Sequence, residues 1–181
     1  RDLTTPPVGP TLLDHIQAQQ GTVVSVGKIG DIFAHKGVNY TVKAVDNMGL
    51  VDQMLDQMAK VKEGLIFVNL VDFDSKYGHR RNVAGYANAL EEFDARLPEI
   101  ESKLEPQDLV LLSADHGCDP TWPGSHHTRE HVPVIFYGHY CGAPVQAYDL
   151  GERATFADMG QTVAHHLGTV PLEYGTACKL T

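Results

Sequence analysis

Three short apolar runs, each followed at once by polar residues, constrain the fold of this chain more than any other feature. The runs are Thr22–Val26, Leu65–Val71 and Asp108–Ser113. The first is apolar and β-branched, and the first two are continuous enough to predict strands buried on both faces. Because stretches with helical spacing separate the runs, the sequence predicts an α/β fold, with right-handed βαβ units and a mainly parallel sheet flanked by helices.

Two longer helices are expected between these strands. One extends from Asn47 to Val61 and the other from Asn82 to about Leu97, and either asparagine can cap the start of its helix. Pro98 is expected to kink or end the second helix. The apolar residues of the first helix recur at helical spacing and are interpreted as core: Met48, Val51, Met54, Leu55 and Met58.

Three shorter elements complete the expected order. A helix from Thr11 to Gln20 is ended by Gly21, and a fourth strand covers Val132–Tyr137, with its proline at a strand start or an edge. The segment Thr155-Phe156-Ala157-Asp158 resembles a capping box and predicts a helix that Gly168 closes.

The segment from Asp115 to Glu130 carries the densest chemistry in the chain. It contains acids, three histidines, two prolines and two glycines, and it is too broken to be a helix or a strand. Neutral imidazoles and carboxylates bind Zn²⁺ or Mn²⁺ at neutral pH, and a loop can turn adjacent residues toward one point. The segment therefore predicts a metal-binding loop, and a polar loop with incidental histidines is the alternative.

Ligand-type residues follow all three strands, and in parallel sheets ligands bind beyond the carboxyl ends of the strands. Five carboxylate and imidazole donors at one edge predict a two-metal site with ions about 4 Å apart. The donors are Asp74, His79, Asp115, His116 and His127, and the same edge receives Lys28. Structural roles are the alternatives, since Asp74 can cap the next helix and His79 or Lys28 can lie on the surface.

The amino-acid composition restricts the classes of function that this chain can have. The 181 residues, 43% of them hydrophobic, suffice for one domain with a core, and a net charge of −9 argues against a nucleic-acid partner. There is no apolar run of about 18 residues, so no membrane span is expected. The chain starts at Arg1 without a leader, as expected of a piece of a longer or processed chain.

The three cysteines are Cys118, Cys141 and Cys178, without CxxC spacing. We interpret them as free thiols in a reducing compartment and expect a cytoplasmic location. Cys118 lies inside the predicted metal-binding loop, but we interpret it as a small buried thiol rather than as a ligand.

Several sequence elements together resemble the phosphopentomutases, a family of the alkaline phosphatase superfamily. The elements are Asn69-Leu70-Val71-Asp72-Phe73-Asp74 with Tyr77-Gly78-His79-Arg80-Arg81, Ala114-Asp115-His116-Gly117, His127-Thr128-Arg129-Glu130 and Thr155-Phe156-Ala157-Asp158. Asp-His-Gly is shared across the superfamily, whereas the combination is specific to phosphopentomutases. The resemblance covers about the second half of a family member, which implies that residues 1–181 are the C-terminal portion of an alkaline-phosphatase-like, metal-binding core domain, without its N-terminal part and cap domain.

The resemblance implies an isomerase of nucleoside and pentose phosphate metabolism. Such an enzyme interconverts α-D-ribose 1-phosphate and D-ribose 5-phosphate, and the deoxyribose pair, through a phosphoenzyme at a site with two Mn²⁺ ions. By this likeness Asp74, His79 and His127 would hold one ion. Asp115 with His116 would help hold the other, although this ligand set alone would accept Zn²⁺ as well.

The resemblance also implies roles for residues outside the proposed ligand set. Lys28 lies where the family has a lysine near the sugar phosphate. Arg129 or Arg80 would either touch phosphate or anchor a ligand loop through a carboxylate. Asn82 and His126 replace residues that are usually acidic in relatives, so the local charge is expected to differ.

The family's nucleophilic threonine and a further metal-binding aspartate lie upstream of the matched region, so no catalytic nucleophile is placed in this chain. Alone, the chain is expected to bind metal weakly and to catalyse little. It would also expose an unpaired sheet edge and an apolar face, and would need the missing N-terminal half or self-association.

Two other functions remain open. One is another phosphoryl-transfer enzyme of the superfamily, such as cofactor-independent phosphoglycerate mutase or a phosphatase. The other is a non-catalytic module for metal binding or assembly.

Overall fold

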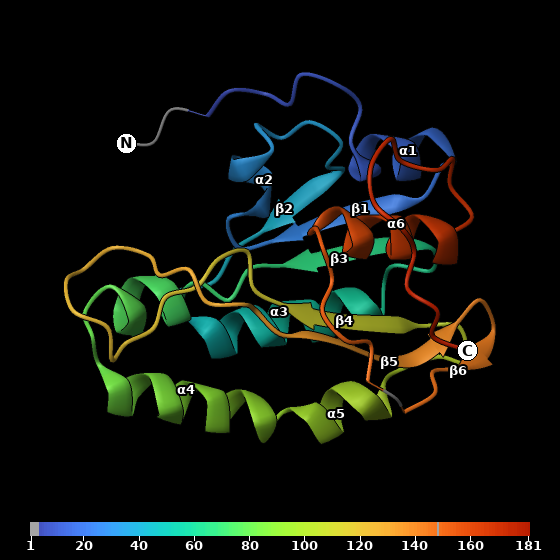
Figure 1. Ribbon diagram of the computed structural model, residues 1–181. Coiled ribbons are helices and arrows are strands. Elements are labelled where there is room, and N and C mark those ends of the chain that lie inside the picture. The colour runs from blue at the N-terminus through green and yellow to red at the C-terminus, as the bar shows by residue number, and fades with distance from the viewer. Residues whose placement is uncertain (1–3, 148) are drawn as a thin grey trace.

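The computed structural model describes residues 4–147 and 149–181, so Arg1 lies outside the described residues. Helices surround two small sheets in a mixed α/β arrangement (Figure 1). None of the helices in the described ranges is long and apolar enough to cross a membrane. The described elements follow in the order α1 (Leu12–Ala18), β1 (Thr22–Val26), α2 (Ile29–Ile32), β2 (Tyr40–Val42), α3 (Asn47–Met58), β3 (Gly64–Val68), the π-helical turn η1 (Phe73–Gly78), α4 (Val83–Asp94), α5 (Leu97–Ser102), β4 (Leu109–Ser113), β5 (Val134–Tyr140), β6 (Ala143–Pro144) and α6 (Ala157–His166).

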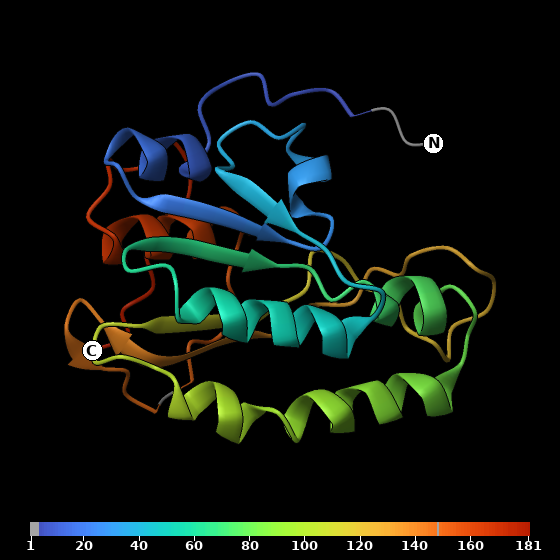
Figure 2. The same cartoon turned by 180° about the vertical axis from the view of Figure 1, so that it is seen from behind.

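The first sheet is parallel and has the order β2-β1-β3. The side chains of its central strand β1 pack alternately into two hydrophobic cores, one on each face of the sheet. Val23 packs with Leu13 and Ile16 of α1, whereas Val24 and Val26 pack toward Leu50 of α3. Helices therefore cover both faces of β1, as Figures 1 and 2 show from opposite sides. This confirms the prediction of a parallel sheet flanked by helices.

The second sheet is antiparallel and has the order β4-β5-β6. The alternation of strands and helices did not predict it. If β5 paired with β4 in a parallel direction, a crossover connection, usually a helix, would have to join the two strands. Residues 114–133 between β4 and β5 contain no helix. The chain therefore reverses direction and pairs beside β4. Pro133 directly precedes β5, as predicted for a strand start.

The long helices begin and end close to the predicted positions. Asn82 caps α4 by accepting a hydrogen bond from the N–H of Gly85 at 2.9 Å, which confirms that prediction. Pro98 falls in the first turn of α5, so it separates α4 from a second helix. The predicted cap of α3 was wrong by one residue, because Asp46 accepts the capping hydrogen bond from Gly49.

Asn47 is instead part of a buried pair that joins α3 to the segment after β3. The backbone N–H of Asn47 donates to Oδ2 of Asp72 at 3.0 Å, and the N–H of Asp72 donates to Oδ1 of Asn47 at 2.9 Å. Lys76 also donates to Oδ2 of Asp72, at 3.0 Å. Because Asn47 and Asp72 are both buried, this exchange fixes the start of η1 against α3.

Replacing Asp72 with alanine should lower the free energy of unfolding by roughly 2–4 kcal/mol, because it leaves the buried N–H of Asn47 without an acceptor. The matched control is Asp46→Ala, which removes an exposed cap and should cost about 1 kcal/mol. Urea denaturation of the two variants measures both values. Equal losses would contradict the special role of the buried pair.

Candidate metal centre

Two of the predicted ligands lie on the π-helical turn that follows β3. Asp74 is in the first turn of η1, and His79 is its C-cap. The N–H of His79 donates to the carbonyl of Asp74 at 3.0 Å, which is an i to i+5 hydrogen bond. This wide turn stacks the two side chains, and Oδ1 of Asp74 lies 3.2 Å from Nε2 of His79.

His127 meets this pair from the loop between β4 and β5. Its Nε2 lies 3.2 Å from Oδ1 of Asp74 and 3.1 Å from Nε2 of His79. Donors about 2.1 Å from a divalent ion are roughly 3.0 Å apart at a right angle and about 3.4 Å apart at the tetrahedral angle. The triangle formed by Asp74, His79 and His127 therefore has the dimensions of one face of a metal coordination shell.

The protonation of this triangle also fits a bound cation. Nδ1 of His79 lies 2.6 Å from the carbonyl oxygen of Ser125, which only accepts hydrogen bonds, so Nδ1 carries the proton of the neutral ring. The lone pair of Nε2 then faces Oδ1 of Asp74, a buried atom without a hydrogen-bond partner in the described structure. A cation between them would remove the repulsion of these lone pairs, and the carbonyl would orient the ligating ring.

His116 extends the cluster on the other side of His127. The two rings stack with centroids 3.7 Å apart, and ligand atoms of Asp74, His116 and His127 all lie within 4.8 Å of one another. Asp115 is 69% exposed, and its Oδ1 lies 3.6 Å from Nε2 of His116. The structure thus brings four predicted ligands together and leaves Asp115 at their rim.

Lys28 is exposed at the residue before α2, beyond the end of β1. Its carbonyl accepts a hydrogen bond from the N–H of Ile32 at 3.0 Å, whereas its side chain makes no hydrogen bond or ion pair with any residue that the structure describes. Its position is at the predicted edge of the first sheet, but no contact joins it to the four clustered ligands.

Arg81 ties the two ligand-bearing segments together, and the sequence interpretation did not identify it. Its guanidinium donates to the carbonyls of Gly124 (2.5 Å), Asp119 (3.0 Å) and His126 (2.6 Å) in the loop. It also donates to the carbonyl of Gly78 (2.9 Å) at the end of η1. One side chain therefore fixes the loop beside the turn, one residue before His127.

Arg80 and Arg129 are the arginines that the sequence predicts for anchoring a ligand loop or for phosphate contact. Both are exposed, and neither forms an ion pair or hydrogen bond within the described ranges. The pair Arg80-Arg81 was the only signal in the sequence. It did not reveal Arg81, because the acceptors are backbone carbonyls rather than the carboxylates that were expected.

Two threonines in the loop have structural contacts. Thr128 accepts a hydrogen bond from the N–H of Asp119 at 2.7 Å and donates to Glu130 at 2.9 Å. This contact lowers the pKa of the Glu130 carboxyl. Thr121 donates twice to Oδ1 of Asp119, and these bonds lower the pKa of the Asp119 carboxyl. Both hydroxyls thus stabilise the shape of the loop.

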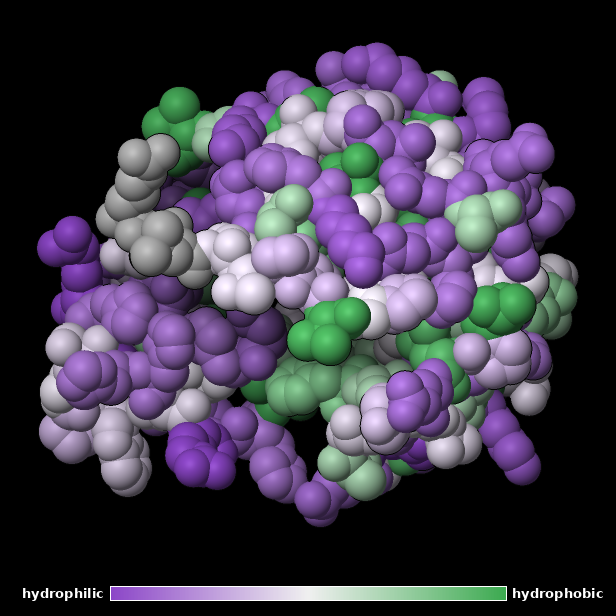
Figure 3. Space-filling view, turned by 90° about the horizontal axis from the view of Figure 1, so that it is seen from above, coloured by the Kyte–Doolittle hydropathy of each residue, from purple (hydrophilic) through white to green (hydrophobic). Residues whose placement is uncertain are grey.

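A groove leads away from the ligands across β5. It encloses about 980 Å³, and the residues that line it include Asp115, His116, Phe156 and Leu180. Ile135 in this groove is 50% exposed. Seen from above, apolar residues gather in a hollow with polar residues around it (Figure 3).

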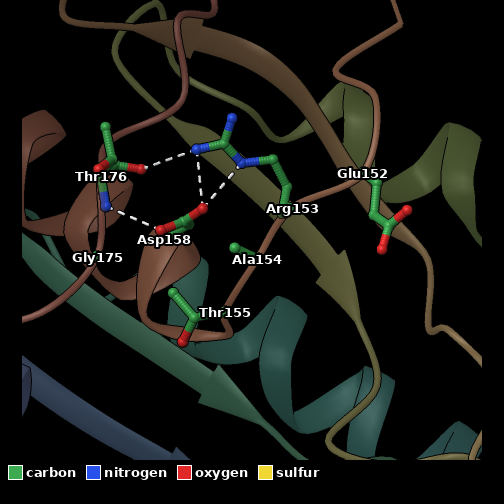
Figure 4. A pocket seen from close by; sticks show the side chains of 7 residues that line it. All are labelled: Glu152, Arg153, Ala154, Thr155, Asp158, Gly175 and Thr176. Carbon is green, nitrogen blue, oxygen red and sulfur yellow. Dashed lines mark hydrogen bonds and ion pairs between the residues drawn. The ribbon is translucent and has the colours of Figure 1, made fainter.

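A smaller pocket of about 440 Å³ lies at the start of α6 (Figure 4). Its buried Asp158 accepts from Nε and Nη2 of Arg153 at 2.9 and 2.8 Å and from the N–H of Thr176 at 2.8 Å. The predicted capping box is only half formed: Oγ1 of Thr155 accepts from the N–H of Ala157 at 3.2 Å, whereas Asp158 is turned to Arg153 and Thr176. Hydrogen bonds of Asp158 and Arg153 with Thr176 therefore hold the C-terminal segment to α6 beside this pocket.

Arg81→Ala should weaken the binding of Zn²⁺ by about 10–100-fold, because His127 would lose its fixed position beside Asp74. Arg80→Ala is the matched control and should change the affinity less than twofold. Isothermal titration gives both affinities, and urea denaturation of the metal-free variants separates a loss of fold from a loss of the site. Equal affinities of the two variants would contradict the positioning role of Arg81.

Comparison with known proteins places this geometry in a family. Residues 13–171 match the family model described as the metalloenzyme superfamily. Phosphopentomutases from Legionella pneumophila (strain Corby), Rhizobium rhizogenes and Yersinia enterocolitica are 52%, 54% and 51% identical to the chain, over 98%, 97% and 96% of its length. The chain spans only 43%, 42% and 42% of these relatives. Because the family model covers most of the chain, the protein belongs to the metalloenzyme superfamily.

Proposed function

We propose that this chain is the metal-binding half of a phosphopentomutase, which interconverts α-D-ribose 1-phosphate and D-ribose 5-phosphate and the corresponding deoxyribose phosphates. The observation that carries the proposal is the triangle of Asp74, His79 and His127, with sides of 3.1–3.2 Å. It lies in a chain that is 51–54% identical to the phosphopentomutases compared above. A site of this type suits phosphoryl transfer, in which negative charge must be offset.

The proposed centre holds two divalent ions, Mn²⁺ by family likeness and Zn²⁺ by ligand chemistry. Asp74, His79 and His127 hold the first ion. Asp115 and His116 contribute to the second, and two contacts support this pairing. The carbonyl of Gly117 lies 3.1 Å from Nδ1 of His116, so the free ring nitrogen Nε2 is the one that faces Asp115 at 3.6 Å.

When bound, the ions offset the charge of the transferring phosphoryl group and of the oxygens that enter and leave it. The residues of this chain orient the site around that charge. The fixed ring of His79 and the loop held by Arg81 keep the donors in place, so little reorganisation is needed. Lys28 is proposed to contact the sugar phosphate from the end of β1, where it is exposed and unpaired in the described structure.

The nucleophile is proposed to come from the N-terminal part that the longer relatives have. Thr121 and Thr128 are the hydroxyls close to the ligands, and both are engaged with carboxylates of the loop. Two further features support such a partner. β3 and β4 are edge strands of their sheets, and Ile135 and Phe156 are 50% and 53% exposed in the groove.

A cytoplasmic location is also part of the proposal. Cys118, Cys141 and Cys178 are all free thiols, which is consistent with a reducing compartment.

His127→Ala should lower the affinity for Mn²⁺ and for Zn²⁺ by at least about tenfold, because it removes one of three donors in the triangle. His126→Ala is the matched control, since its exposed side chain has no contact with the triangle in the described structure, and its affinity should stay within about twofold. Isothermal titration measures both. A loss of similar size in both variants would count against the assignment of His127.

The longer protein, with the N-terminal part of the relatives, should convert ribose 5-phosphate to ribose 1-phosphate and should not turn over phosphoglycerate. The chain by itself should show no mutase activity, because it contains no proposed nucleophile. A coupled assay with both substrates tests these expectations. Turnover by the isolated chain would refute the division between the two parts, and turnover of phosphoglycerate would assign another reaction of the superfamily.

A further inference from the structure

Cys118 lies against the metal centre, unlike the other two cysteines. It is only 8% exposed and follows Gly117, which forms an isolated bridge with Thr128 in the ligand loop. A Cβ atom on Gly78 would collide with Sγ of Cys118, so the absence of a side chain on Gly78 leaves room for the thiol beside η1. The sulfur is therefore held over the turn that carries Asp74 and His79.

The position of this sulfur creates a second group of ligand atoms. A carboxylate oxygen of Asp74, a ring nitrogen of His79 and Sγ of Cys118 all lie within 4.8 Å of one another. Oδ1 of Asp74 is buried and has no hydrogen-bond partner in the described structure. The group shares Asp74 and His79 with the triangle described above, but it offers sulfur where the triangle offers the nitrogen of His127.

The surrounding charges are compatible with a thiolate bound to a cation. Burial and the neighbouring Asp74 carboxylate raise the pKa of the Cys118 thiol, whereas the guanidinium of Arg81 acts in the opposite direction. A thiol carries a proton that a metal-bound thiolate does not. A bound divalent ion would displace that proton to solvent, and Arg81 would remain close to the resulting complex.

We propose that Asp74, His79 and Cys118 form an alternative cation position that takes thiophilic divalent ions, with Zn²⁺ and Cd²⁺ as examples, in preference to Mn²⁺ and Mg²⁺. Thiolate ligands favour soft ions, whereas the other donors of the centre are carboxylates and imidazoles. The step is a ligand exchange without redox chemistry: one S–H bond breaks, one S–metal bond forms and the proton leaves to water. This inference rests on the proposed function, because it concerns the same centre.

The two positions exclude one another. Asp74 and His79 belong to both groups, so an ion bound through Cys118 occupies donors that the ion beside His127 requires. A thiophilic ion would therefore compete with the ion that the proposed phosphoryl transfer uses. The sulfur makes the centre sensitive to the kind of divalent ion that reaches it.

The test is a titration of the protein with Cd²⁺, followed by the ultraviolet sulfur-to-cadmium charge-transfer absorption. The wild-type protein should develop this band, Cys118→Ser should lose it, and the matched control Cys141→Ser should keep it. Serine keeps a small polar side chain at this position, so the variant tests ligation by sulfur rather than the packing of the side chain. Cys118→Ser should also weaken Cd²⁺ binding at least about tenfold relative to Mn²⁺ binding.

A band that persists in Cys118→Ser, or no band in the wild-type protein, would overturn the inference. His127→Ala separates it from the proposed function, because this variant should lose Mn²⁺ affinity and keep the Cd²⁺ band. If the wild-type protein shows the Cys118-dependent band but the longer protein has no mutase activity, the proposed function fails and the inference stands. If the mutase is active and the band is absent, the inference fails and the proposed function stands.

Discussion

The hydrogen bonds of Arg81 are the interaction on which the candidate metal centre depends. Asp74 and His79 arrive on a turn after β3, whereas His127 arrives on a loop after β4, and β3 and β4 belong to different sheets. The loop has little regular structure of its own to hold it there. Because the guanidinium binds carbonyls of both segments, the backbone is fixed and the side chains of the donors remain available for a cation.

The turn itself depends on a second, buried set of contacts. The exchange of hydrogen bonds between Asn47 and Asp72 fixes the start of η1 against α3, and α3 packs on the parallel sheet. The position of Asp74 is thus continuous with the core around β1. The antiparallel sheet carries the loop with His127 on the other side of the candidate centre. The distances between the donors therefore depend on how the two sheets are placed relative to one another.

The amino-acid sequence predicted which polar residues follow the ends of the strands. Polar residues after the strands predicted that Asp74, His79 and His127 would meet, and they do. The predicted reason, a single parallel sheet, was wrong for His127, because β4 belongs to the separate antiparallel sheet. The sequence did not predict the antiparallel pairing of β5, although the loop from Asp115 to Glu130 was expected to contain no helix and such a connection favours a reversal of direction. It also missed Arg81, because hydrogen bonds to carbonyls leave no pattern of partner side chains in the sequence.

The charge of the proposed centre explains why it should need further groups. Asp74 and Asp115 supply two negative charges, and the three neutral histidines supply none, whereas two divalent ions carry four positive charges. A bound phosphate ester, or a carboxylate from the N-terminal part of the relatives, would offset the remainder. Asp115, which is 69% exposed at the rim of the groove, lies where such a group would enter. The excess of positive charge therefore favours anionic ligands at the open side of the centre. A thiolate at Cys118 would lower this excess by one charge and so weaken the attraction for anionic ligands.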